Sequence, residues 1–274
     1  MIVSFFHPAR FIAFSLTSIG GIHPHVFFEG MAYLVAACVY LYLRRRFGDT
    51  LVTPIRWAVV AVAVAGATIG SKLLFLLEDP QLTWRSLNDP AYLMGGKTIV
   101  GALFFGLLAV EAMKRYIGLT QSTGDLYAIP LAVGIAIGRV GCFLTGLSDN
   151  TYGTQSSLPW AVDFGDGIRR HPTQLYEIVF LLALVPLLYR IMRSIAAGPA
   201  PGKFQPGDAF RFFMVAYMLF RLLCDFIKPY PRILLGLGGI QWACLLVLLY
   251  YSRDVIRWLR PGRDHGAASA ETAV

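Results

Sequence analysis

Residues 138–143 read Gly-Arg-Val-Gly-Cys-Phe near the end of a long apolar run, and residues 170–177 read Arg-His-Pro-Thr-Gln-Leu-Tyr-Glu at the start of the next one. A polar stretch lies between these two motifs. An arginine inside an apolar run costs roughly 2.5–3.5 kcal/mol on membrane-insertion scales. Arg139 therefore requires a partner that offsets this cost. We interpret the rest of the chain as the frame that holds this arginine at a membrane surface.

The composition indicates a membrane protein. Of 274 residues, 56% are hydrophobic and only 15% are charged, whereas a soluble domain carries about 25% charged residues. Seven apolar runs are long enough, or nearly so, to cross a bilayer core of about 30 Å. They are residues 27–43, 57–77, 94–113, 126–146, 174–189, 208–226 and 237–251. We therefore expect one all-α integral membrane domain, residues 1–274, with about seven transmembrane helices.

The distribution of basic residues predicts the orientation. The loops after the first, third, fifth and seventh runs carry most of the lysines and arginines, as at residues 44–46. The positive-inside rule then places the N-terminus outside and the C-terminus in the cytoplasm. We expect an interfacial or re-entrant segment at 1–22, an outer-face polar loop at 147–173 and a flexible cytoplasmic tail at 261–274. The net charge of +8 follows mostly from this bias, so it does not indicate nucleic-acid binding.

Two arginines on different helices are expected at nearly the same depth. Arg139 lies fourteen residues after Asp125, and Arg221 lies thirteen residues after Asp208. At 1.5 Å per residue both reach roughly 20 Å into the core. Arg221 and Asp225 are four residues apart and can pair on one helix face. A purely structural salt bridge is the alternative interpretation of that pair.

Lys97 and Lys228 are expected at the same outer-leaflet depth as the two arginines. Such a cation cluster requires an anion, and a lipid phosphate matches the planar fork of arginine. A carrier for a small anionic solute would show the same pattern. For Lys97 the alternative is a side chain that snorkels to the surface. Glu29 is either an interfacial residue paired with a cation or part of the site.

The cysteines and the N-terminal histidines give weaker signals. No CxxC pair or disulfide framework is present, and all four cysteines fall inside apolar runs. Cys142 is interpreted as packing or, because it stands beside Arg139, as a nucleophile. His23 and His25 are interpreted as loop residues.

The motifs at 138–143, at Tyr152-Gly153 and at 170–177 together resemble the prolipoprotein diacylglyceryl transferase family, and the similarity extends over most of the chain. This family moves a diacylglyceryl group from phosphatidylglycerol to the thiol of a lipobox cysteine in a secreted precursor. The reaction takes place at the outer leaflet of the bacterial cytoplasmic (inner) membrane. The resemblance implies a multi-pass transferase with no metal and no bound cofactor. From the cation cluster and this resemblance together, we predict that the substrates are bound by Arg139, Arg221, Lys228, Lys97, Tyr176, Gly153 and Cys142.

The sequence departs from the family pattern at several positions. Val100 stands where the family has an essential histidine, and Cys142 replaces an asparagine. Glu29 replaces a tyrosine, Leu147 replaces an acid, and Lys228 replaces a second arginine. We therefore expect a divergent member, whose acceptor is a lipobox cysteine or another group.

Thiol chemistry needs a base or a cationic environment that produces the thiolate. His171, Glu29 and Asp225 are the candidate bases, and His171 is preferred because its unperturbed pKa near 6.5 suits the task. The alternative role of His171 is to position the loop. The catalytic residues are therefore predicted to be His171, Arg139, Arg221 and Glu29. The competing function is a phospholipid-binding or lipid-moving membrane protein without transfer chemistry.

Overall fold

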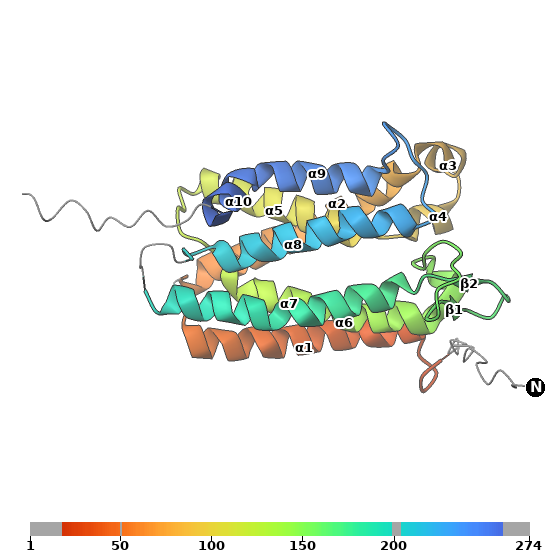
Figure 1. Ribbon diagram of the computed structural model, residues 1–274. Helices are drawn as coiled ribbons and strands as arrows, with labels where there is room; N and C mark the ends of the chain where they lie inside the picture. The colour runs from red at the N-terminus through yellow and green to blue at the C-terminus, as the bar shows by residue number, and fades with distance from the viewer. Residues whose placement is uncertain (1–17, 50, 199–203, 260–274) are drawn as a thin grey trace, which may run out of the picture.

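The computed structural model describes residues 18–49, 51–198 and 204–259, which form a bundle of long helices lying side by side (Figure 1). Each of the seven apolar runs contains a helix. These helices are α1 (Pro24–Phe47), α2 (Thr53–Glu78), α5 (Ile99–Tyr116), α6 (Asp125–Thr145), α7 (Thr173–Ala196), α8 (Asp208–Cys224) and α9 (Gly239–Tyr250). The all-α prediction is confirmed for the bundle.

Within the described ranges, four helices are long and apolar enough to cross a membrane by themselves: α1, α2, α6 with its 3-10 extension, and α7. The chain is therefore a multi-pass membrane protein. Helix α9 has 12 residues and α8 has 17, so each is shorter than the ~20 residues that a perpendicular crossing requires. Seven crossings and the direction of the termini remain predictions.

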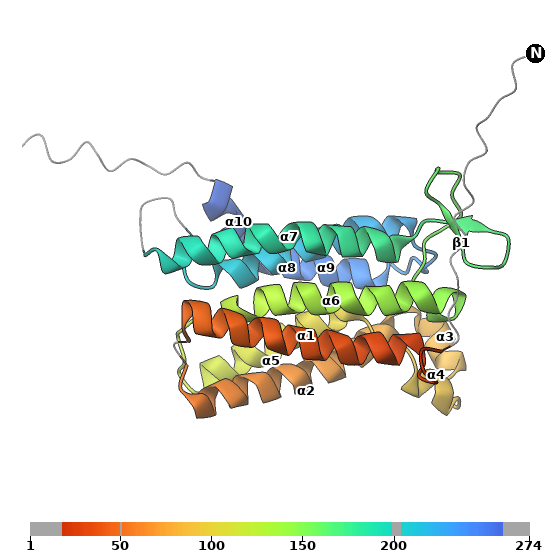
Figure 2. The same ribbon diagram turned by 90° about the horizontal axis from the view of Figure 1, so that it is seen from below.

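One end of the bundle carries most of the irregular structure (Figures 1 and 2). Helices α1 and α7 begin there, beside the short helices α3 (Pro80–Arg85) and α4 (Pro90–Met94). Helix α10 (Ser252–Leu259) lies at the opposite end. The expected tail at 261–274 lies outside the described residues, as does most of the expected N-terminal segment.

Small residues bring α2 and α5 close together. A Cβ atom on Gly70 would lie 2.1 Å from Cβ of Phe105, and one on Gly101 would lie 2.4 Å from the Gly70 carbonyl oxygen. The third apolar run was expected to begin at residue 94, but its helix, α5, begins only at Ile99. Gly96 has a φ of +40°, and the Thr98 hydroxyl caps the helix by accepting from Gly101 N–H. Lys97 therefore precedes the helix.

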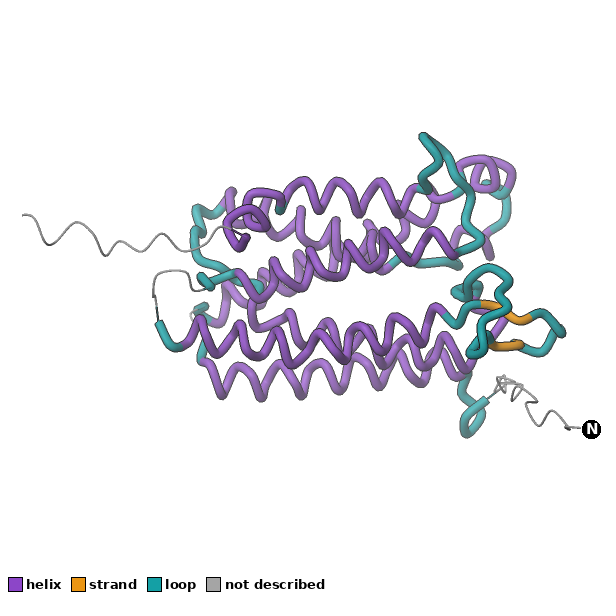
Figure 3. Tube along the Cα trace, viewed as in Figure 1, coloured by secondary structure: helices purple, strands orange, loops and turns teal. Residues whose placement is uncertain are grey.

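The polar loop predicted at 147–173 has regular structure of its own. It contains the 3-10 helix η1 (Gly146–Asp149) and an antiparallel hairpin of β1 (Val162–Asp163) and β2 (Arg169–Arg170) (Figure 3). Both nitrogens of the Arg170 fork donate to the Asp166 carboxylate at 2.7 Å. This pairing holds the pKa of Asp166 at about 2, below its ordinary value. The all-α description therefore needs one correction, a two-stranded hairpin at the end of the bundle.

Candidate active site

A buried ion-pair cluster lies where α6, α7 and α8 meet. Nε of Arg139 on α6 lies 2.9 Å from Oε2 of Glu177 on α7, and a guanidinium nitrogen of Arg221 on α8 lies 3.4 Å from the same oxygen. The exposed fractions are 7% for Arg139, 3% for Arg221 and 1% for Glu177. One carboxylate therefore holds both arginines inside the bundle.

Two further groups complete this cluster. The Tyr217 hydroxyl donates to the other Glu177 oxygen at 2.6 Å, and Arg221 donates to Asp225 at 2.7 Å. The predicted pairing of Arg221 with Asp225 is confirmed, although Asp225 begins the 3-10 helix η2 (Asp225–Ile227) after α8 has ended. Because each arginine contacts a carboxylate, the desolvation cost of its burial is partly offset.

Lys228 follows η2 and is only 3% exposed. Its ammonium group lies 5.3 Å from the centre of the Tyr230 ring, and no carboxylate of the described residues is within ion-pairing distance. Burial, together with the charges of Arg221 and Arg139, lowers the pKa of Lys228 to about 8. A lysine that is buried without a counter-ion beside two arginines favours the binding of an anion.

Unused hydrogen-bonding groups surround the cluster. Among the described side chains, Nε of Arg139, Nε of Arg221 and both amide atoms of Gln174 are buried without a hydrogen-bond partner. Although Nε of Arg139 lies 2.9 Å from Oε2 of Glu177, its N–H bond does not point at that oxygen, so no hydrogen bond forms. Gln174 precedes Glu177 by three residues and so shares its face of α7. Buried polar groups are normally satisfied, so these groups indicate the position of a polar ligand.

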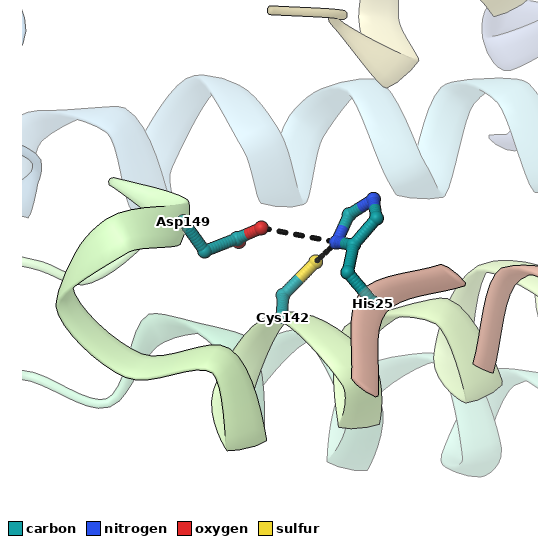
Figure 4. A group of neighbouring side chains, drawn as sticks. All are labelled: His25, Cys142 and Asp149. Atoms are coloured by element: carbon teal, nitrogen blue, oxygen red, sulfur yellow. Dashed lines mark hydrogen bonds and ion pairs between the residues drawn. The ribbon is translucent and has the colours of Figure 1, made fainter. Parts of the chain in front are cut away.

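A second group of side chains adjoins Arg139. The Cys142 sulfur accepts from Arg139 at 3.7 Å and lies 4.0 Å from Nδ1 of His25, and the same Nδ1 is 3.1 Å from an Asp149 oxygen (Figure 4). His25 comes from the first turn of α1, Cys142 from α6 and Asp149 from η1. The interpretation of His25 as a loop residue is therefore wrong, because Pro24 starts α1 immediately before it.

Glu29 continues this group toward the surface. Its carboxylate lies 3.9 Å from Nε2 of His25 and 3.6 Å from the Lys97 ammonium group, and it accepts from the Tyr33 hydroxyl at 3.2 Å. The Lys97 side chain is 69% exposed. The structure thus places Lys97 outside the buried cluster, where it pairs with Glu29.

The remaining predicted site residues form a separate group. Nδ1 of His171 lies 3.2 Å from the Tyr176 hydroxyl, which also accepts from Trp160 at 2.8 Å. Gly153 is buried against His171, since a Cβ there would lie 2.6 Å from the histidine Cβ. In the described part of the chain, no hydrogen bond or ion pair joins His171 to Arg139. His171, Tyr176 and Gly153 therefore tie the loop to the start of α7.

Comparison with known proteins identifies the family. The family model for prolipoprotein diacylglyceryl transferase matches residues 12–255. The chain belongs to the prolipoprotein diacylglyceryl transferase family. A phosphatidylglycerol–prolipoprotein diacylglyceryl transferase of Bordetella avium is 31% identical over 236 residues, covering 80% of this chain and 85% of the relative. A protein of the same name from Nitratidesulfovibrio vulgaris is 27% identical over 227 residues, covering 81% and 80%.

One feature of this diacylglyceryl transferase family member concerns proton chemistry. Val100, at the position of the expected family histidine, is 1% exposed and packs in the apolar core with residues such as Leu74. It can neither accept nor donate a proton. Val100 therefore cannot be the base for the acceptor thiol.

Sequence reasoning assigned no site role to Glu177, Tyr217, Gln174, His25 or Asp149. Glu177 and Gln174 lie inside the 170–177 motif, so the sequence could have identified both as site residues. Tyr217 lies four residues before Arg221, on the same helix face. His25 and Asp149 carried no such signal, because they meet Cys142 only through the packing of α1 against α6.

Proposed function

We propose that this protein transfers a diacylglyceryl group from phosphatidylglycerol to the cysteine thiol of a prolipoprotein. Membership of the family and the names of the relatives support this activity. The predicted outward-facing N-terminus supports a reaction at the outer leaflet of the bacterial cytoplasmic membrane. The lipobox cysteine is the proposed acceptor, and another acceptor group is the alternative.

The observation that carries the proposal is the buried cation cluster. Arg139 and Arg221 share Glu177, while Lys228 has no carboxylate within ion-pairing distance in the described residues. A phosphodiester headgroup supplies the missing negative charge and acceptors for the unpaired arginine N–H groups. Arg139, Arg221 and Lys228 are therefore proposed to bind the phosphate, with Gln174 beside them.

The same cations would promote the chemical step. The acceptor thiolate attacks the glyceryl methylene carbon, a carbon–sulfur bond forms, and the carbon–oxygen bond to the phosphate breaks. The electron pair of that bond leaves with glycerol phosphate. Fixed cations aimed at the charge that develops on a leaving group lower the barrier, because they need no reorganisation during the reaction. Glu177 acts as a positioning residue that orients the two arginines.

Glu29 and His171 are the proposed candidates for proton transfer. The contacts of Glu29 support it over His171, because His25 links Glu29 to Cys142 beside Arg139. His171 instead contacts Tyr176 and the loop backbone. Its proposed role is to hold the loop, together with Gly153, against the start of α7.

A non-catalytic lipid-binding or lipid-moving protein is the second candidate function. The apolar Val100 at the expected histidine position favours it, since the site would then bind phosphatidylglycerol without activating a thiol. Both candidate functions require that Arg139 binds the phosphate, but only the transferase forms a diacylglyceryl-modified thiol as its product.

The test measures transfer of radiolabelled diacylglyceryl from phosphatidylglycerol to a lipobox peptide by the purified full-length protein in detergent. Arg139→Lys and Arg139→Ala are compared with Arg85→Ala, a matched control because Arg85 is exposed on α3. Thermal unfolding of every variant separates loss of activity from loss of fold. We expect transfer by the wild type and by the control, and loss in both Arg139 variants.

Two other outcomes have clear meanings. If the wild type binds phosphatidylglycerol but forms no labelled peptide, the non-catalytic function is favoured. If folded Arg139→Ala transfers at the wild-type rate, the buried cations are not the phosphate site.

A further inference from the structure

We propose that His25, Cys142 and Asp149 form a metal site for a zinc-like divalent cation, which holds the acceptor thiol as a thiolate. The second half of this proposal rests on the proposed transferase function. The first half, metal binding, stands on the geometry of the three side chains. Their ligand atoms all lie within 4.8 Å of one another.

The contacts converge on a single ring nitrogen. Both the Cys142 sulfur, at 4.0 Å, and the Asp149 carboxylate, at 3.1 Å, face Nδ1 of His25 (Figure 4). One proton on Nδ1 cannot point at both groups, so without a metal the Cys142 thiol would have to donate its own proton to Nδ1 or to Asp149. A nucleophilic triad instead requires the thiol and the carboxylate on opposite ring nitrogens. A cation between the three atoms satisfies all of them at once.

The spacing suits a tetrahedral metal. With Zn–N near 2.0 Å and Zn–S near 2.3 Å, neighbouring ligand atoms in a tetrahedron are separated by about 3.5 Å. The carboxylate-to-imidazole distance of 3.1 Å is slightly below that value, and the sulfur-to-imidazole distance of 4.0 Å is slightly above it. Side-chain rotations that bring the three ligand atoms, which lie within 4.8 Å of one another, to this spacing would close the site.

Outer groups hold these ligands in place. The second Asp149 oxygen accepts from the Thr151 hydroxyl at 2.6 Å, and Nε2 of His25 faces the Glu29 carboxylate at 3.9 Å. Carboxylates and hydroxyls behind metal ligands fix their orientation. Gly141 lets α6 approach α1, since a Cβ there would lie 3.3 Å from Cα of His25.

The donor set and its exposure indicate an open coordination position. Cysteine, histidine and aspartate are all zinc ligands, and three protein ligands with a free fourth position are typical of catalytic zinc. The His25 side chain is 40% exposed, whereas Asp149 is 10% exposed and Cys142 is buried. The site is therefore accessible from the side of His25, where an acceptor thiol could enter.

The position of the site matches the transfer step. Arg139 donates to Cys142 at 3.7 Å, so a thiol bound at the open position would lie close to the proposed phosphate site. Coordination removes the thiol proton, for which Glu29 is the nearby acceptor, and leaves a thiolate. This thiolate attacks the glyceryl carbon and glycerol phosphate departs, with no change in the oxidation state of the metal.

This site also accounts for two departures from the family pattern that occur together. Val100 cannot serve as a base, and Cys142 supplies a sulfur ligand where the family has an asparagine. A metal-activated thiol does not need the missing histidine. The expectation from family resemblance that no metal takes part would then not hold for this member.

The first experiment measures zinc binding by the purified full-length protein in detergent, using isothermal titration and elemental analysis after gel filtration. Cobalt(II) is the spectroscopic probe, because a thiolate-to-cobalt charge-transfer band reports a sulfur ligand. We expect one zinc per chain, and a Kd raised about 100-fold or more in Cys142→Ser, His25→Ala and Asp149→Asn, beyond the effect of losing an outer group. Cys224→Ser is the matched control, because Cys224 and Cys142 are each 6% exposed.

The cobalt band should disappear in Cys142→Ser and persist in Cys224→Ser. Absence of stoichiometric zinc in the wild type would overturn the site. So would unchanged zinc affinity in the three ligand variants while each retains its thermal unfolding transition.

The second experiment separates this site from the transferase proposal. Transfer is measured after removal of metal with a chelator and again after zinc is restored. Loss and recovery support thiol activation, whereas full transfer by metal-free protein overturns it. If zinc binds as expected but the wild type forms no labelled peptide under any condition, the metal site stands and the transferase function fails.

Discussion

Two of the arginine–carboxylate arrangements in the described residues lie in contrasting surroundings, one at the hairpin and one inside the bundle. At the hairpin, Arg170 donates two hydrogen bonds of 2.7 Å to the carboxylate of Asp166, which is exposed. Inside the bundle, Arg139 and Arg221 share Glu177 with poorer alignment, and all three are buried. The better hydrogen-bond geometry thus belongs to the exposed pair.

The difference shows that burial, more than hydrogen-bond geometry, decides how strongly the loss of one partner of an ion pair affects stability. Exposed ion pairs contribute little to stability, because water and salt screen them. Removal of one partner of a buried pair leaves an uncompensated charge, which is strongly destabilising. The hairpin pair therefore orders a loop. The buried cluster instead places positively charged groups where they can bind an anionic ligand.

The largest effect is expected from Glu177→Gln. This change leaves Arg139 and Arg221 buried without their shared carboxylate, at a cost on the order of 3 kcal/mol. Transfer should be abolished, and the melting temperature in detergent should fall by several degrees. A melting temperature equal to that of Asp166→Asn would remove the distinction between the two arrangements.

Arg139→Lys should have the next largest effect. The charge remains, but the fork that can bind two phosphate oxygens is lost. We expect transfer to fall about 100-fold, as for removal of one donor from an anion-stabilising site. Steady-state kinetics with phosphatidylglycerol varied checks this, with Arg169→Lys in the hairpin as control. A loss in Arg169→Lys as large as that in Arg139→Lys would contradict the proposed role.

Lys228 gives a pH-dependent test of the buried cluster. Its pKa is lowered to about 8, so the ammonium is charged below that pH and loses its charge as the pH rises through it. Arginine stays charged throughout this range. The ratio of Lys228→Arg to wild-type transfer should therefore increase from about pH 7 to about pH 9. Taking the ratio cancels the ionisation of the acceptor thiol, and a constant ratio would show that the Lys228 charge does not matter.

The smallest effect is expected from Asp166→Asn. Since the pKa of Asp166 is lowered to about 2, its ion pair is intact above the ordinary carboxyl pKa. The stabilisation is lost only as the pH falls toward about 2. At neutral pH the variant should transfer within about twofold of wild type, because the pair is exposed. A tenfold loss would show that the hairpin takes part in the reaction.

The sequence predicted the helices well and the site in part. Apolar runs indicated each long helix, because burial in lipid or protein requires continuous apolar residues whatever their packing. The boundary at Ile99 was missed because the apolar run was taken to begin at residue 94, whereas Gly96 has a positive φ and α5 begins only after its N-cap, Thr98. Arg221 and Asp225 were paired correctly because four-residue spacing is a local property.

Long-range neighbours could not be predicted in the same way. Lys97 was grouped with the buried cations by its expected depth, but it lies before α5 and pairs with Glu29. His25 was assigned to a loop because a single histidine near a proline gives no signal of its distant partners. Whether His171 or Glu29 moves a proton stays a prediction.

The sequence by itself determined that this is a multi-pass membrane protein with arginines in apolar helices and the motifs of one enzyme family. These properties follow from composition and from spacing along single helices. Only the tertiary structure decided that Glu177 joins Arg139 to Arg221 and that His25, Cys142 and Asp149 meet. The physical reason is that such contacts depend on the rotation and close approach of helices, which small residues such as Gly141 permit and which no local spacing specifies.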